Sequence, residues 1–577
     1  MKTNKIILTL LALISLSITT NNLIILKKYT PIGYKIDLYS QLPPTFWYGL
    51  LIVYFICCIL ILTEWKKFKI VGIITLFINY CLLFYIPYAF GYYVLGRDDE
   101  ISHLGEINNI ILTGNFDPSD IYPATHIIFS STSMISGIPP NILSIILPLV
   151  FSIIFVYGIF IFSKLYINNT KIMHIIIPCS FIYYLGHFHF SIVPNYLFFI
   201  LIPLILFILS KYLTLKTFSY SFILMLFVLI LPFGHPFIFI YLFLIFIFLE
   251  LYMLIKGKHK KILNMILISI CTFITWFIYN RYYLSSFRAV YHSFKNSITM
   301  SVMAETLEKT SKIQLEMIEF IRLIFFYYGR YIIPLLFITI LLIYILIRRI
   351  QLNKNERKTI YLLTVSIIIS GLFEGFLTFN PFISHSPDRI SNLNFTVFPM
   401  IPLFAISIYE LILKKIKTPI GTIISSIILT LVFTASMYGA FYSPIIYHPN
   451  IATTSNEIYG MNWLFINKDE KPIYDLQGSI GYRFSDLLFG WSETKRRFNK
   501  DIKFSNEGNL RNHFGYDKND FFDEHNKYIV LTTIGEELYQ TVYKKVERYN
   551  ASDFKKFRKD PNVNKIYDSL NIEIYKS

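Results

Sequence analysis

Apolar runs of about 20 residues recur through the first three quarters of the chain, and no other feature of the sequence restricts the fold as strongly. A helical run of this length crosses a hydrocarbon layer of about 30 Å. Because lipid offers the backbone no hydrogen-bond partner, each span has to satisfy its own peptide groups, and we therefore expect helices. Charged residues make up only 15% of the chain, against roughly 25% in ordinary globular domains, which also indicates a membrane protein.

The sequence predicts a polytopic α-helical membrane domain over residues 1–441, with about thirteen transmembrane helices. The predicted spans are 6–26, 45–63, 70–95, 142–162, 172–186, 192–213, 217–232, 236–255, 262–279, 331–347, 360–378, 395–413 and 421–441. Two connections, 96–141 and 281–330, are too long to be simple turns, and we expect both to be external loops.

The basic residues predict the orientation of the chain. Alternate connections are rich in Lys and Arg, as in 66–69, 256–261 and 348–358, and such loops face the cytoplasm. We therefore expect a multi-pass protein of the cytoplasmic (plasma) membrane with a cytoplasmic N-terminus. The formal net charge is +17, but residues 442–577 hold 20 basic and 19 acidic side chains, so the excess belongs to the membrane part. It indicates contact with anionic membrane lipids and not with nucleic acid.

Residues 442–577 differ from the rest of the chain because their apolar runs are short and their charge is high. Helix-like stretches at 458–466 and 552–558 alternate with strand-like stretches at 472–476, 527–532, 566–567 and 572–575. This pattern predicts a small extracytoplasmic α/β domain. The five cysteines all lie in apolar spans, so no disulfide framework is expected.

An acidic cluster follows the third predicted span directly. Asp98, Asp99 and Glu100 stand in a row, and His103 lies one helical turn further on. If this segment is a helix, Asp99, His103 and Glu106 share one face. The opposite face would then carry the apolar residues Ile101, Leu104, Ile111 and Leu112. We expect such a helix to lie on the membrane surface with its acidic side toward water.

Two kinds of chemistry suit this cluster. Asp99, Glu100 and His103 are suitable ligands for a divalent metal such as Mg or Mn. Alternatively, a carboxylate could act as general base toward an acceptor hydroxyl. A third interpretation is a solvated charged loop without chemistry. The nearby Tyr122 and His126 favour a functional site.

In layout, the chain resembles the membrane glycosyltransferases of the GT-C type, which include oligosaccharyltransferases, protein mannosyltransferases and aminoarabinose transferases. The resemblance rests on the polytopic domain, the Asp98-Asp99-Glu100 motif in the first external loop, His103, Tyr122-Pro123 and His126, and the C-terminal external domain. It implies that Asp98, Asp99, Glu100 and His103 are catalytic. It also implies a donor sugar carried on polyprenyl phosphate or pyrophosphate, and a glycan, lipid or protein acceptor.

A donor of this kind leaves a phosphate, which requires cations. Arg389, beside Asp388, and Arg330, at the outer end of the tenth span, could clamp phosphate oxygens through paired hydrogen bonds. Asp388 could instead simply pair with Arg389. Arg330 could instead extend its side chain to the membrane interface.

Other polar residues near external helix ends are candidates for substrate binding. Glu374 lies near the outer end of the eleventh span, facing either a cavity or the shallow interface. His187, His189 and His235 occupy predicted external turns, where they either line one pocket with the acidic loop or form ordinary interfacial hydrogen bonds.

The chain departs from the oligosaccharyltransferases in two respects. It lacks their Trp-Trp-Asp-Tyr-Gly signature, and it has histidines where a second acidic pair would complete a metal site. A metal-free mechanism with Asp98 or Asp99 as base therefore stays open. We predict a glycosyltransferase, with a transporter or lipid flippase and a non-catalytic assembly subunit as alternatives.

Overall fold

Apolar helices make up most of the structure. The computed structural model describes residues 2–29, 33–97, 99–183, 186, 189–215, 217–257, 262–280, 315–347, 350, 352–379, 393–476, 480–498, 514, 527–546 and 549–577. Within these residues, nine helices are long and apolar enough to cross a membrane, and four shorter apolar helices lie among them. The prediction of a helical membrane protein is confirmed.

The helices follow the predicted spans. The long ones are α1 (Lys2–Lys28), α2 (Pro44–Leu62), α3 (Lys66–Ala89), α6 (Pro140–Lys164), α8 (Pro194–Phe199) with α9 (Ile202–Leu215), α11 (Pro236–Ile255), α15 (Met317–Leu346), α16 (Lys354–Phe379) and α19 (Ile420–Tyr438). The shorter ones are α7 (Thr170–Tyr183), α10 (Phe218–Gly234), α12 (Leu263–Tyr279) and α18 (Val397–Ile408), which continues into a π-helical turn at Tyr409–Leu413.

Local sequence explains where several helices begin. Pro44, Pro140, Pro194 and Pro236 each stand at the start of a helix, where the missing N–H costs no hydrogen bond. Helix α15 begins at Met317, because Glu316 and Glu319 form a capping box there. Residues 317–330, which the sequence places in a loop, are therefore helical. The other part of the predicted loop, 281–314, lies outside the described residues.

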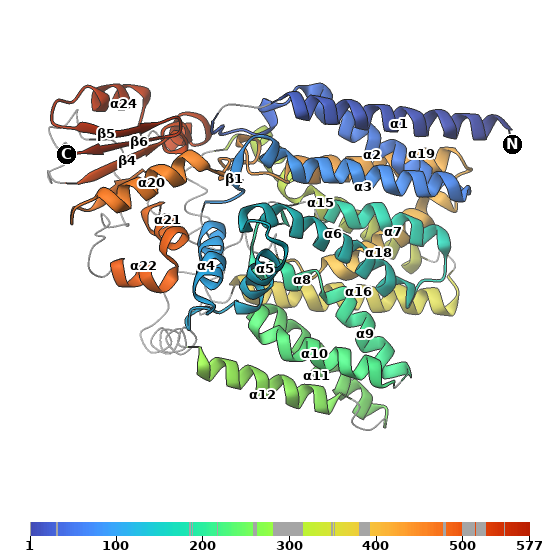
Figure 1. Ribbon diagram of the computed structural model, residues 1–577. Helices are drawn as coiled ribbons and strands as arrows, with labels where there is room; N and C mark the ends of the chain where they lie inside the picture. The colour runs from blue at the N-terminus through green and yellow to red at the C-terminus, as the bar shows by residue number, and fades with distance from the viewer. Residues whose placement is uncertain are drawn as a thin grey trace.

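The loop after α3 contains two helices, α4 (Asp99–Thr113) and α5 (Pro123–Ser136). Figure 1 shows both at the end of the bundle nearest the C-terminal strands. Strand β1 (Tyr92–Val94) pairs antiparallel with β2 (Thr453–Thr454). Next to this pairing, Arg97 and Glu457 form a buried ion pair of 2.5 Å. The acidic loop is thus joined to a segment more than 350 residues away.

The C-terminal region, residues 442–577, contains a four-stranded mixed sheet in the order β3-β4-β6-β5. Strand β3 (Ile473–Asp475) runs parallel to β4 (Tyr528–Thr532), and β6 (Ile572–Lys576) runs antiparallel to both β4 and β5 (Asn564–Ser569). The helices of this region are α20 (Ser455–Asn467), α21 (Ile480–Phe489), α22 (Trp491–Phe498), α23 (Thr533–Glu537) and α24 (Ala551–Arg558). Short helical turns occur at Tyr39–Gln41, Pro444–Ile446, Leu538–Val542 and Lys544–Val546.

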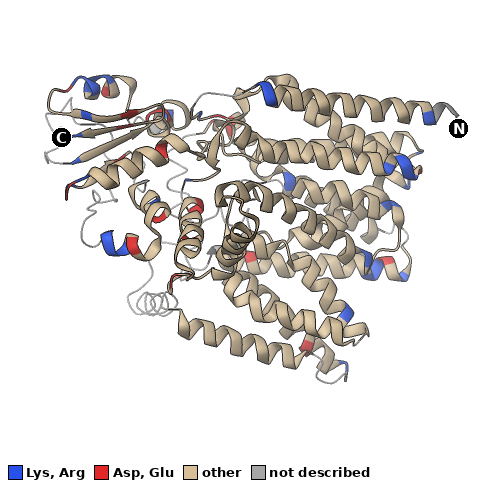
Figure 2. Cartoon of the chain, in the orientation of Figure 1, with Lys and Arg blue, Asp and Glu red and all other residues tan. Residues whose placement is uncertain are grey.

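The two chain termini lie at opposite ends of the molecule (Figure 1). Figure 2 shows that Lys and Arg gather at the ends of the bundle helices, whereas the middle stretches of these helices are almost without charge. This distribution is what burial in a hydrocarbon layer requires, because charged side chains are costly at the bilayer centre.

Gly105 allows α4 to pack closely against α21. A Cβ atom at this position would lie 2.1 Å from the backbone oxygen of Asp486. We predict that Gly105→Ala destabilises the protein by about 1–3 kcal/mol, because the added methyl group would force the two helices apart. Thermal unfolding in detergent micelles measures this effect.

Gly375→Ala provides the matched control, because no atom of the described residues lies within 4 Å of a Cβ built on this helical glycine. Alanine favours a helix over glycine by up to about 1 kcal/mol, so this variant should be neutral or slightly more stable. Equal behaviour of the two variants would contradict the close packing of α4 on α21.

Candidate functional site

Beyond Asp99, the polar face of α4 is buried. Glu100, His103 and Glu106 are all buried, and so are Ile101 and Leu104 of the predicted apolar face, whereas Leu112 near the end of the helix is 84% exposed. The expectation that the acidic side of α4 faces water is therefore wrong for His103 and Glu106, whereas Asp99 is 49% exposed. The polar face is buried because residues of the following loop, α5, α21 and α22 supply its hydrogen-bond partners.

Three buried side chains form a hydrogen-bonded relay. The Asp120 Oδ2 atom lies 2.6 Å from His126 Nδ1, and His126 Nε2 lies 2.9 Å from His103 Nδ1. Because the ionised carboxylate can only accept, His126 donates from Nδ1 and its Nε2 accepts from His103. In its neutral form, His103 then has a lone pair on Nε2, as a general base requires.

Backbone contacts hold the carboxylate end of the relay in place. The Asp120 side chain also accepts a hydrogen bond from the backbone N–H of Tyr122, at 2.8 Å. The backbone oxygen of Asp120 accepts from Asn280 Nδ2, at 2.7 Å, at the end of α12. These contacts fix Asp120 and therefore the orientation of His126.

Aromatic rings surround the two histidines. The Tyr122 ring centroid lies 5.9 Å from that of His103, and on its other side Tyr122 stacks on His235 at 5.3 Å. The Trp491 ring lies 5.8 Å from His103, and its Nε1 donates to the backbone oxygen of Ser102. The predicted residues Tyr122, His126 and His235 therefore lie together with His103.

Asp99 faces a different partner. It is 49% exposed and forms an ion pair of 2.7 Å with Arg483 of α21. Arg483 also donates to the Ser102 hydroxyl, which donates to Asp486. Asp99 thus joins α4 to the C-terminal region. Glu100 is buried close to Gly96.

The predicted metal ligands do not converge. Among the residues that the structure describes, which exclude Asp98, no three His, Cys, Asp or Glu side chains lie close enough to hold a metal ion. The set Asp99, Glu100 and His103 therefore does not form a metal site by itself.

Arg330 lies in a second polar cluster. Its side chain is only 6% exposed, and its Nε and Nη1 atoms have no hydrogen-bond partner within the described part of the chain. A Cβ built on Gly186 would lie 2.9 Å from Arg330 Nη1 and 3.1 Å from His189 Nδ1, so these side chains meet over this glycine. A buried guanidinium with unused donors is suited to an anionic ligand. It does not extend into water, as interfacial snorkelling would require.

Helix α8 connects the two clusters. His189 packs on Tyr196 of α8, with ring centroids 3.9 Å apart. Phe198 of the same helix packs tightly against Gly234, whose neighbour His235 stacks on Tyr122. Packing contacts through α8 therefore link the histidines near α4 with Arg330 of α15.

Five predicted residues have not yet been placed. Asp98, His187, Asp388 and Arg389 lie outside the described residues, and their roles stay predictions. Glu374 is buried and accepts a hydrogen bond from the backbone N–H of Thr396 at 2.9 Å. The Glu374 carboxylate thus provides a hydrogen-bond acceptor for the backbone just before α18.

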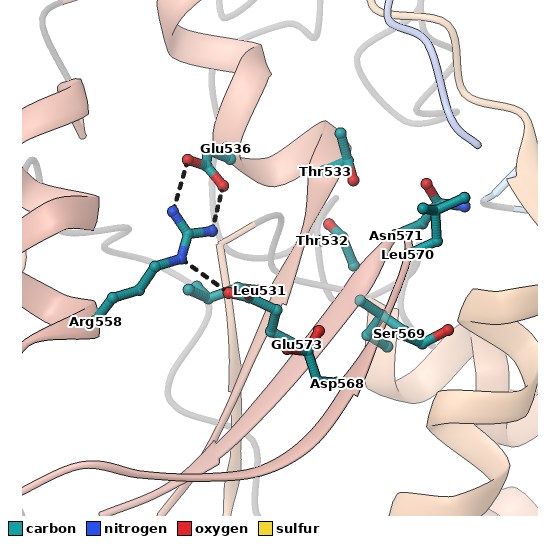
Figure 3. A pocket seen from close by; sticks show the side chains of 11 residues that line it. Leu531, Thr532, Thr533, Glu536, Arg558, Asp568, Ser569, Leu570, Asn571 and Glu573 are labelled. Atoms are coloured by element: carbon teal, nitrogen blue, oxygen red, sulfur yellow. Dashed lines mark hydrogen bonds and ion pairs between the residues drawn. The ribbon is translucent and has the colours of Figure 1, made fainter. Parts of the chain in front are cut away.

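A hollow of about 400 Å³ lies on the C-terminal sheet (Figure 3). Arg558 is the cation in its wall, and it forms ion pairs with Glu536 at 2.7 Å and with Glu573 at 3.0 Å. Because these carboxylates already neutralise Arg558, this arginine is less suited to an anionic ligand than Arg330.

A scan against protein-family models found no match, and no curated protein matches the chain. The resemblance to GT-C enzymes stays a prediction. Sequence reasoning missed Asp120 and the C-terminal partners Arg483, Asp486 and Trp491. The spacing of Asp120 from Tyr122 and His126 was a usable local signal, but no pattern connects the acidic loop with residues near 490.

Glu106 generates a prediction about pH. Burial raises its pKa to about 7, and Oε1 accepts a hydrogen bond from the backbone N–H of Asp117 at 2.7 Å. The native state thus favours the protonated acid, and this stabilisation is lost as the pH rises through 7. We predict that Glu106→Gln reduces the decline in stability between pH 5 and pH 8 by on the order of 2–3 kcal/mol.

Thermal unfolding across this pH range measures the effect. Part of the slope should remain, because burial also raises the pKa of Asp486 to about 6. Glu470→Gln removes an exposed carboxylate and should leave the slope unchanged. An unaltered slope in Glu106→Gln would contradict the burial of this acid.

Proposed function

We propose that this chain is a membrane glycosyltransferase, which moves a sugar from a polyprenyl-phosphate-linked donor to an acceptor at the extracytoplasmic face. The observation that carries the proposal is the buried, incompletely bonded guanidinium of Arg330, connected through α8 to the Asp120–His126–His103 relay. One cluster suits a phosphate, and the other suits a hydroxyl group that must lose a proton.

The two clusters support a direct transfer. The acceptor oxygen forms a bond to C1 of the sugar while the bond from C1 to the phosphate oxygen breaks. The acceptor proton passes to His103 Nε2, and His126 with Asp120 stabilises the resulting imidazolium. The negative charge on the departing lipid phosphate is neutralised by Arg330. The acceptor is a glycan, a lipid or a protein.

The membrane setting matches such a donor. A polyprenyl tail requires a site beside the bilayer, and the relay lies where apolar helices meet the C-terminal region. We propose thirteen membrane crossings, corresponding to the nine long and four shorter apolar helices. With basic connections in the cytoplasm, the N-terminus is cytoplasmic, and the C-terminal region covers the site from outside.

The direct test is sugar transfer from a lipid-linked donor in reconstituted membranes. We predict that His103→Gln lowers the transfer rate at least 100-fold, since a general base typically contributes a factor of 10²–10⁴. We expect a loss of similar size for Arg330→Met and a partial recovery for Arg330→Lys, because lysine keeps the charge but not the paired donors.

Controls separate these effects from misfolding. His448→Gln and Arg322→Met replace a histidine outside the site and an exposed arginine of the same helix α15, and both should retain full transfer. A wild-type protein without transfer activity would favour a flippase, a transporter or a non-catalytic assembly subunit. Full activity of His103→Gln would refute the role of the relay.

The orientation has its own test. We predict that a cysteine placed at Lys555 reacts with a membrane-impermeant maleimide in intact cells. A cysteine at Lys67 should react only after the membrane is permeabilised. The reverse pattern would place the relay in the cytoplasm and exclude the proposed reaction at the outer face.

A further inference from the structure

A second pocket lies at the other end of the bundle, remote from the C-terminal sheet. It has a volume of about 190 Å³ and is enclosed by the end of α2 and the beginnings of α3, α7 and α19. Figure 2 shows that Lys and Arg gather at this end of the helices. The pocket shares no residue with the proposed transfer site.

Basic side chains meet in this pocket. Lys69, Lys171 and His174 line it, and Lys69 Nζ lies 3.4 Å from His174 Nδ1. Among the described residues of the lining, Glu64 is the one carboxylate, and it is exposed. Because the Lys69 ammonium can only donate, His174 Nδ1 accepts and this ring is neutral. The positive side-chain charge of the pocket therefore comes from the two lysines, and both would attract an anion placed between them.

Three helix N-termini add positive potential. Helices α3, α7 and α19 all begin at the pocket, and none has an acidic residue in its first turn. Each N-terminus carries roughly half a positive charge and directs backbone N–H groups outward. Together with the two lysines, the partial positive charges of the three N-termini outweigh the negative charge of Glu64 and the roughly half negative charge at the end of α2.

The walls also provide neutral donors and apolar surface. Threonine hydroxyl groups lie around the pocket, at Thr170, Thr418 and Thr422. Leu62 and Leu413 complete it on the apolar side. Exposed isoleucines, such as Ile70 and Ile423, follow within the first turns of α3 and α19. A polar, positive hollow thus adjoins surface that suits acyl chains.

We propose that this pocket binds the phosphate group of an anionic phospholipid, whose acyl chains lie along the adjoining apolar helix surface. Lys69 and Lys171 pair with the phosphate, and the helix N-termini and threonine hydroxyls supply further hydrogen bonds. The pocket lies where the apolar helices end, so a lipid headgroup is the phosphate source that the position favours. This inference does not depend on the proposed glycosyl transfer.

Native mass spectrometry of the full chain in neutral detergent tests the proposal. Phosphatidylglycerol, phosphatidylcholine and inorganic phosphate are each added to the purified protein. We expect phosphatidylglycerol to bind in preference to phosphatidylcholine. Lys69→Gln with Lys171→Gln should weaken its binding on the order of tenfold or more, in keeping with about 1 kcal/mol for each lysine near anionic lipid.

The matched control is Lys66→Gln with Lys67→Gln, which removes two charges from the same helix end outside the pocket and should retain binding. Lys69→Arg with Lys171→Arg keeps the charge and should also retain binding, which excludes a folding defect as the cause. Equal losses in both glutamine pairs, or equal binding of the two lipids, would overturn the proposal. Displacement of phosphatidylglycerol by an equal concentration of inorganic phosphate would overturn the lipid assignment.

Discussion

A helix that carries carboxylates and a histidine on one face can be buried only if its polar groups find partners, and this constraint governs the arrangement around α4. The partners come from two directions. Asp117 and His126 follow α4 closely in the sequence, whereas Asp486 and Trp491 belong to the C-terminal region. Without both sets, the buried face would lose several kcal/mol of hydrogen bonding, because an unmet buried polar group costs about 1–3 kcal/mol. The relay is held in place because Asp120, His126 and His103 find their hydrogen-bond partners within this buried face.

The positions of the apolar helices could be predicted because the membrane imposes a simple rule on sequence. Hydropathy over about 20 residues locates a span, since the backbone in lipid has few alternatives to a helix. The same rule fails beyond the hydrocarbon layer. The start of α15 depends on the hydrogen bonds of the capping box at Glu316. A hydropathy profile does not detect such hydrogen bonds.

The candidate site was predictable only in its local part. His103, Tyr122 and His126 lie within 24 residues of one another, and this nearness in sequence is enough to suggest that they share one site. The direction of the acidic face was predicted wrongly, because a polar face that contacts another protein surface has the same sequence pattern as one that contacts water. Arg483 and Asp486 could not be found, since their pairing with α4 depends on the tertiary fold. Arg330 was found because a departing phosphate requires a cation, and this arginine stands at the predicted outer end of a span.

The distance in sequence between Ser102 and Asp486, which are hydrogen-bonded to each other, has a consequence for biosynthesis. They are 384 residues apart, so α4 leaves the ribosome long before the segment that covers it has been made. Most bundle helices enter the bilayer during this interval, while the polar face of α4 is still hydrated. A copy that stops short of α21 would therefore keep this face wet and open, and a protease could distinguish it from a finished molecule.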